Sequence, residues 1–107
     1  MELPGSDIIS LFKSNLKELY GTRLSKLILF GSYAREEAKA DSDIDFLVVL
    51  KDGNISVFNE IEEINEKVYN LILESGKIIS FIPTTEEIFE NSSNYFYSRI
   101  KQEGIIV

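Results

Sequence analysis

The chain has 107 residues, of which 44% are hydrophobic and 11% aromatic, so it has enough apolar material for a folded core and lacks the composition of a disordered chain. It contains no cysteine and no histidine, which excludes disulfides, thiol nucleophiles and zinc sites built from these residues. The formal net charge of −7 disfavours non-specific nucleic-acid binding, and it suits either a basic partner or solubility alone.

The length predicts a single domain spanning residues 1–107, because single domains usually run to about 100–150 residues and no stretch resembles a linker. The first residues do not form a basic region followed by an apolar run, so no signal peptide is predicted. The longest apolar run, Phe46 to Leu50, is far shorter than the roughly 20 residues of a membrane span. We therefore expect no membrane segment and a cytoplasmic location.

Hydrophobic periodicity and turn residues predict helices that alternate with strands. In chain order the predicted elements are a helix over 6–20, a strand over 24–30, a short helix or helical turn over 33–40, a strand over 43–50, a long helix over 55–75, a strand over 77–82, and helices over 84–91 and 94–102. Pro83 is expected to end the third strand, and Thr84 with Glu87 to form a capping box for the helix that follows. This order predicts an α/β (α+β) fold with a small mixed sheet flanked by helices.

The last segment is rich in apolar and aromatic side chains, more than a short terminal helix must bury. These residues are Phe89, Tyr95, Phe96, Ile100, Ile105, Ile106 and Val107. They either cover the open side of the small sheet or form part of an interface with another chain. A homodimer is one form that such an interface can take.

Two acidic residues begin the second predicted strand, Asp43-Ile44-Asp45. Alternate side chains of a strand share a face, so both carboxylates are expected to point the same way. Two such close carboxylates repel each other unless a cation lies between them, and carboxylates prefer hard ions such as Mg²⁺. The pattern is therefore consistent with a metal site, although a solvated strand start has the same sequence.

A second pattern follows the first predicted strand, where Gly31-Ser32 is followed by Ala34 and Arg35. Glycine permits close approach of a ligand to the backbone, and the first amides of a helical turn attract phosphate. An ordinary turn is the alternative for this segment alone. Ten residues separate Ser32 from Asp43, enough for a turn that returns the chain beside the first strand.

Taken together, Gly31-Ser32, Ala34-Arg35, Ser42-Asp43 and Asp45 resemble the signature of the polymerase-β-like nucleotidyltransferases. The chain is most similar to their minimal prokaryotic branch, which is often the antitoxin partner of a HEPN-domain toxin. The resemblance implies the nucleotidyltransferase fold, with Gly31 and Ser32 holding the nucleotide's phosphates. It implies that Asp43 and Asp45 bind Mg²⁺. Arg35 either braces the loop and phosphates or forms a surface ion pair with Glu36, Glu37 or Asp41.

Active members of this family usually have a third carboxylate on the neighbouring strand. The aligned position here is Ser80, a neutral hydroxyl that is a poor metal ligand and a very poor base. Glu74, Glu86 and Glu87 are candidates for the missing third carboxylate. The simpler interpretation is that they are exposed acids at helix ends. Tyr33, inside the signature, is expected to be a surface aromatic or to lie over the pocket.

The resemblance implies an enzyme that transfers AMP from ATP, with Mg²⁺, to a protein hydroxyl, most simply a tyrosine of a cognate HEPN-type toxin. The chain would thereby act as an antitoxin. The alternative, supported by Ser80, is a catalytically impaired antitoxin of the same fold that neutralises its partner by binding alone. Transfer to a small molecule is a weaker third hypothesis, because such enzymes usually need more sequence for an acceptor pocket.

Overall fold

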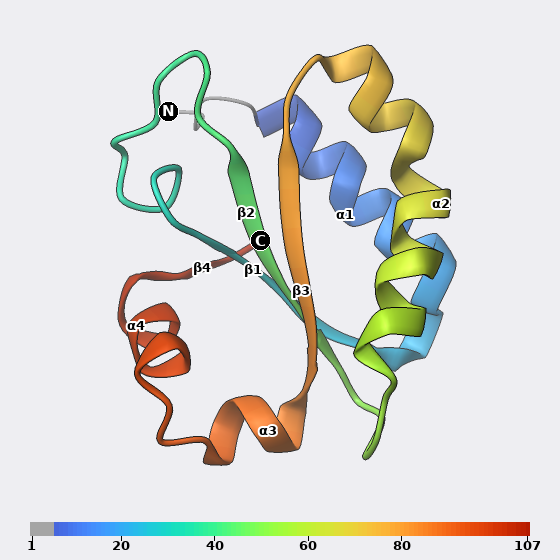
Figure 1. The fold of residues 1–107 in the computed structure, drawn as a ribbon, viewed down its shortest axis with the longest axis vertical. Coiled ribbons are helices and arrows are strands. Elements are labelled where there is room, and N and C mark those ends of the chain that lie inside the picture. The colour runs from blue at the N-terminus through green and yellow to red at the C-terminus, as the bar shows by residue number, and fades with distance from the viewer. Residues whose placement is uncertain (1–5) are drawn as a thin grey trace.

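The computed structural model describes residues 6–107, which form one four-stranded sheet with helices on both faces (Figure 1). In chain order the elements are α1 (Ser6–Tyr20), the 3-10 turn η1 (Gly21–Arg23), β1 (Leu24–Phe30), β2 (Ile44–Leu50), α2 (Val57–Ser75), β3 (Ile79–Thr85), α3 (Glu86–Asn91), α4 (Tyr95–Glu103) and β4 (Ile105–Ile106). The strand order is β3-β2-β1-β4. β2 runs antiparallel to β1 and parallel to β3, so the predicted mixed sheet is confirmed.

The two faces of the sheet carry separate apolar clusters because successive side chains of a strand alternate in direction. On one face, α1 and α2 pack over the larger cluster, where Phe12 stacks on Phe46 with ring centroids 4.4 Å apart. On the other face, Phe89 of α3 and Ile100 of α4 cover a smaller cluster with Leu47. Figure 1 shows α1 and α2 together on one side of the sheet and α4 on the other.

The third strand was predicted with the wrong bounds, since β3 continues through Pro83 to Thr85. β3 lies at one end of the strand order, where a proline is tolerated because its missing N–H need not remove a ladder hydrogen bond. The predicted capping box is also wrong. Thr85 caps α3 instead of Thr84, and its hydroxyl accepts a hydrogen bond of 3.2 Å from the Ile88 amide.

The long helix begins two residues later than predicted, because Ser56 is its N-cap and accepts from the Asn59 amide at 3.4 Å. It ends as predicted at Gly76, which has a φ of 67°. The apolar last segment divides its side chains between two environments. Phe89 and Ile100 are buried against the sheet, whereas Tyr95 and Ile106 remain largely exposed, so covering the sheet accounts for only part of this segment.

Candidate functional site

The loop after β1 forms consecutive tight turns, which agrees with the predicted helical turn but forms no regular helix. The Arg35 amide donates to the Gly31 carbonyl at 3.1 Å, and the Glu37 amide donates to the Ser32 carbonyl at 2.9 Å. The far end of the loop is closed by the Lys39 amide, which donates to the Ser42 hydroxyl at 2.8 Å. The loop therefore returns the chain to β2 in a defined conformation.

Gly31 brings the loop against the acidic residues of β2. It has a φ of 75°, a left-handed conformation that side chains rarely adopt. A Cβ atom built on Gly31 would collide with the carboxylate of Asp45. Glycine is therefore required at this position for two reasons, the backbone conformation and the close approach of Asp45.

β2 begins at Ile44, so Asp43 lies just before the strand and Asp45 is its second residue. By alternation, Asp45 lies on the sheet face that carries Leu47. Asp43 is exposed and Asp45 is half-buried. Burial is the main cause that raises the pKa of Asp45, and the negative charge of Asp43 raises it further, while Arg35 acts in the opposite direction. The ionised pair is thus costly in the absence of a cation, and its oxygen ligands suit a hard ion such as Mg²⁺.

Ser80 lies directly beside Asp45, because β2 and β3 pair in the register Asp45 to Ser80. Its side chain occupies the place where the family resemblance implies a third carboxylate. Glu86 and Glu87 are in the first turn of α3, beyond the opposite end of β3 from Ser80. Within residues 6–107, no group of three or more acidic side chains lies close enough together to hold a metal ion.

Arg35 makes ion pairs with Glu37, at 3.3 Å, and with Glu103 of α4, at 3.6 Å. The Glu37 pair was one of the predicted alternatives, whereas the Glu103 pair was not predicted. Tyr33 differs from both expectations, because its side chain is buried in the larger cluster and does not lie over a pocket. It anchors the loop to the core.

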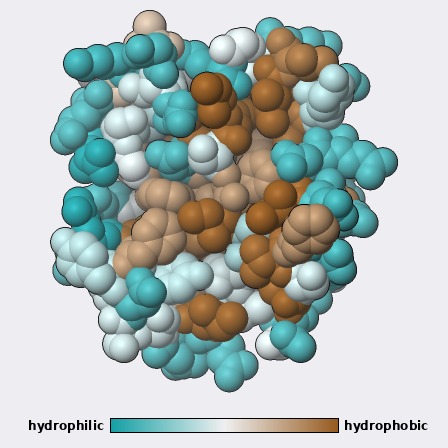
Figure 2. Space-filling model, viewed as in Figure 1, coloured by the Kyte–Doolittle hydropathy of each residue, from teal (hydrophilic) through white to brown (hydrophobic). Residues whose placement is uncertain are grey.

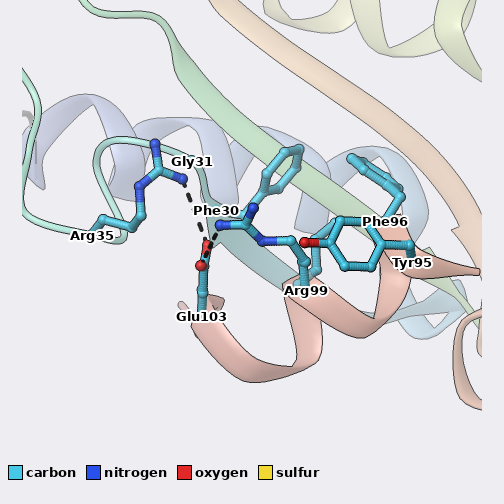
Figure 3. A pocket seen from close by; sticks show the side chains of 8 residues that line it. Phe30, Gly31, Arg35, Tyr95, Phe96, Arg99 and Glu103 are labelled. Atoms are coloured by element: carbon cyan, nitrogen blue, oxygen red, sulfur yellow. Dashed lines mark hydrogen bonds and ion pairs between the residues drawn. The ribbon is translucent and has the colours of Figure 1, made fainter.

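A cavity of about 360 Å³ opens beside Gly31, between the end of β1 and α4 (Figure 3). The sequence analysis did not predict it, because its two walls are at least 60 residues apart in the chain. β1 and the following loop contribute Phe30, Gly31 and Arg35. The other wall is formed by the α4 residues Tyr95, Phe96, Arg99, Ile100 and Glu103.

The raised pKa of Asp45 predicts that Asp45→Asn stabilises the protein in the absence of metal. The folded chain holds the Asp45 proton to a higher pH than the unfolded chain does, so stability falls as the pH rises through this interval. Near neutral pH the ionised side chain still carries that cost, and Asn removes it. Thermal melting in the presence of a chelator should therefore show a higher melting temperature for Asp45→Asn.

The matched control is Asp41→Asn, which removes one exposed carboxylate from the same loop. Added Mg²⁺ should raise the melting temperature of the unaltered protein and of Asp41→Asn, but not that of Asp45→Asn, since a ligand stabilises only the state that binds it. An Asp45→Asn variant that melts lower than the unaltered protein in chelator would contradict this account of the site.

Within the part of the chain that the structure describes, no helix is both long and apolar enough to cross a membrane. A mixed sheet with helices on both faces, and a loop that meets acidic residues at the start of β2, agrees with the nucleotidyltransferase fold. Residues 9–107 match the model of the nucleotidyltransferase domain family, and the chain belongs to this family. It is a nucleotidyltransferase enzyme.

The chain is similar to "Putative protein adenylyltransferase MJ0604" of Methanocaldococcus jannaschii, with 36% identity over 92% of this chain and 93% of the relative. Its fold is similar to that of a putative nucleotidyltransferase from Sulfolobus solfataricus, with a TM-score of 0.64, 19% identity, and coverage of 94% of this chain and 78% of that one. It is also similar to a chain of a toxin–antitoxin structure with AMP-PNP, with a TM-score of 0.59, 18% identity, and coverage of 88% and 70%.

Proposed function

We propose that this enzyme transfers AMP from ATP to a hydroxyl group of a protein, specifically a tyrosine of a cognate HEPN-type toxin, and so acts as an antitoxin in the cytoplasm. The observation that supports the proposal is the close approach of Gly31 to the Asp45 carboxylate, which brings the turn after β1 next to the acidic residues at the start of β2. The protein acceptor is supported by the named function of the relative that aligns with almost the whole chain.

In this reaction the acceptor oxygen attacks the α-phosphorus of ATP, the bond to the bridging oxygen breaks, and pyrophosphate leaves. Gly31 and Ser32 would bind the β- and γ-phosphates through the amides of the turn and the Ser32 hydroxyl. Arg35 lies at the same loop and would offset phosphate charge. Asp43 and Asp45 would hold Mg²⁺, which, when bound, supplies neutralisation of the charge that develops on the phosphates.

The acceptor hydroxyl must lose its proton, and the described site offers no third carboxylate to take it. Ser80 cannot act as a base near neutral pH. The proton therefore passes to solvent or to a group on the acceptor protein. We expect catalysis to rest mainly on positioning and charge neutralisation, and to be slow.

Ser80→Asp should increase the rate of transfer by about tenfold or more, since a positioned general base typically contributes roughly 100- to 10,000-fold. The side chain at position 80 is exposed and lies beside Asp45, so an added carboxylate reaches the acids without disturbing the core. Initial rates of AMP transfer measure the effect. The control is Ser80→Asn, because Asn has the shape of Asp without its charge. An equal rate of transfer for the two variants would argue against a missing base.

A protein partner is consistent with the surface of the molecule. Figure 2 shows apolar side chains gathered on the face that carries β3 and α2, and exposed apolar residues of these elements and of the turn between them include Phe58, Tyr69, Leu73, Ile78 and Ile82. Apolar surface of this kind marks interaction sites. The net charge of −7 favours a partner with basic groups. The toxin–antitoxin structure of the same fold supports a toxin as that partner.

The test is incubation with Mg²⁺, a HEPN-type toxin and ATP labelled either at the α- or at the γ-phosphate. The expected result is label on the toxin from α-labelled ATP only, and its loss when the acceptor tyrosine is replaced by phenylalanine. No transfer to any co-expressed partner would refute the enzymatic proposal. Neutralisation of the toxin without labelling would instead show that binding alone is sufficient.

A further inference from the structure

The cavity beside Gly31 has a charged end and an aromatic end (Figure 3). Arg35 and Glu103 lie at the end nearest Gly31, and Tyr95 and Phe96 lie at the other end. Phe30 stands between them and meets the Phe96 ring edge-on, with centroids 5.6 Å apart. A ligand that fits this lining has phosphate or another anion at one end and a flat, largely apolar group at the other.

Two of the three aromatic side chains of α4, those of Tyr95 and Phe96, are not buried in the core. Tyr95 is 75% exposed and Phe96 39%, although Ile100 of the same helix is buried at 3%. The fold therefore uses Ile100 to attach α4 to the sheet and leaves the two rings at the cavity. Exposed aromatic faces of this kind form stacking platforms for nucleobases, because every base offers a π-face.

The cavity lies next to Asp45, because two of its lining residues, Phe30 and Gly31, neighbour that residue. Phe30 lies opposite Asp45 in the register of β1 and β2, so the two side chains share one face of the sheet. Gly31, which also lines the cavity, is in contact range of the Asp45 carboxylate. A nucleotide with its phosphates at Gly31 can therefore extend directly along α4.

Two guanidinium groups at the cavity, those of Arg35 and Arg99, can bind an anionic ligand. Glu103 pairs with both of them and Glu37 also pairs with Arg35, so the two guanidinium groups are matched by two carboxylates. The side chains are partly exposed, at 38% for Arg35, 45% for Arg99 and 32% for Glu103. Ion pairs between exposed side chains are weak. Either guanidinium can therefore exchange part of its contact with Glu103 for a phosphate oxygen at little cost.

We infer that this cavity binds the nucleoside part of ATP, with the base stacked against Tyr95 and Phe96 and the phosphates directed to Gly31 and Arg35. Arg99 lies over the Tyr95 ring, 5.9 Å from its centroid, and offers a second planar surface to the base. The inference rests on the proposed nucleotidyltransferase reaction and adds the residues that recognise the nucleoside.

The test compares calorimetric titrations with Mg²⁺-ATP and with inorganic tripolyphosphate plus Mg²⁺. For the unaltered protein we expect ATP to bind more tightly. Tyr95→Ala should weaken ATP binding by about tenfold, the usual effect of removing one stacked aromatic ring, and leave tripolyphosphate affinity unchanged. Tyr95→Phe, which keeps the ring, should retain ATP affinity. Tyr69→Ala is the matched control, since Tyr69 is a similarly exposed tyrosine, at 62%, on α2 across the sheet.

Equal affinities for ATP and tripolyphosphate, with no effect of Tyr95→Ala on either, would overturn the inference and leave the proposed transfer reaction intact. Intact ATP affinity in Tyr95→Ala, combined with slower labelling of the toxin, would assign the rings to the acceptor tyrosine and also overturn it. Failure of the unaltered protein to bind either ligand would overturn the inference together with the proposed function. Unchanged far-UV circular dichroism of each variant establishes that the fold is retained.

Discussion

The double variant Asp43→Asn, Asp45→Asn is expected to lose AMP transfer by at least about a thousandfold, the upper effect of removing one group that stabilises developing charge. The two carboxylates are two residues apart at the start of β2, and within residues 6–107 no third acidic group joins them. Nothing in the described site can therefore replace them. Single-turnover transfer of α-labelled AMP measures the loss, and calorimetry should show that Mg²⁺ no longer strengthens ATP binding.

The control for this variant is Asp41→Asn, Glu36→Gln, which removes the same charge from exposed positions of the neighbouring loop. It should transfer AMP at close to the unaltered rate. Equal losses in the two double variants would show that net charge near the loop, and not the paired ligands, controls the reaction. A toxin that is still neutralised by the inactive variant would show that complex formation alone blocks it.

Gly31→Ala should destabilise the protein and abolish nucleotide binding. The left-handed conformation at φ 75° costs roughly 1–3 kcal/mol for a residue with a side chain, and the new methyl group collides with the Asp45 carboxylate. Relief of that collision displaces either the loop or Asp45, so the phosphate and metal sites are both disturbed. Urea denaturation measures the loss of stability, and titration with Mg²⁺-ATP measures the loss of binding.

Gly76→Ala separates the cost of the left-handed backbone conformation from the cost of the collision with Asp45. Gly76 has a similar φ of 67°, but a Cβ atom there would meet no atom within 4 Å. Gly76→Ala should therefore lose about 1 kcal/mol of stability and bind ATP normally. If Gly31→Ala binds ATP as well as Gly76→Ala does, the close contact with Asp45 has no role in the site.

Local patterns in the sequence predicted most of the fold because they depend on near neighbours. The helical periodicity before Gly21 and the apolar run before Gly31 both appear as predicted. The errors arose where long-range pairing overrides local preference. Pro83 is a strand breaker by itself, but β2 holds the whole segment from Ile79 to Thr85 in parallel register.

The residues of the candidate site were also predicted only where their positions depend on near neighbours. The tight turn at Gly31 and the place of Asp45 in a strand follow from local backbone geometry, and they were predicted. The α4 wall was not, because it depends on where β4 pairs. Ile105 lies opposite Leu29 of β1, and this pairing brings α4, which immediately precedes β4, to the end of the first strand. No local signal in the sequence carries that information.

The contact between Gly31 and Asp45 also has a thermodynamic consequence. A cation held by Asp45 would fix the carboxylate that borders the turn at Gly31, so cation and nucleotide would act on the same few atoms. Such sites are coupled, and the coupling is reciprocal: the factor by which Mg²⁺ tightens ATP binding must equal the factor by which ATP tightens Mg²⁺ binding. Each ligand should therefore bind more tightly in the presence of the other, and by the same factor.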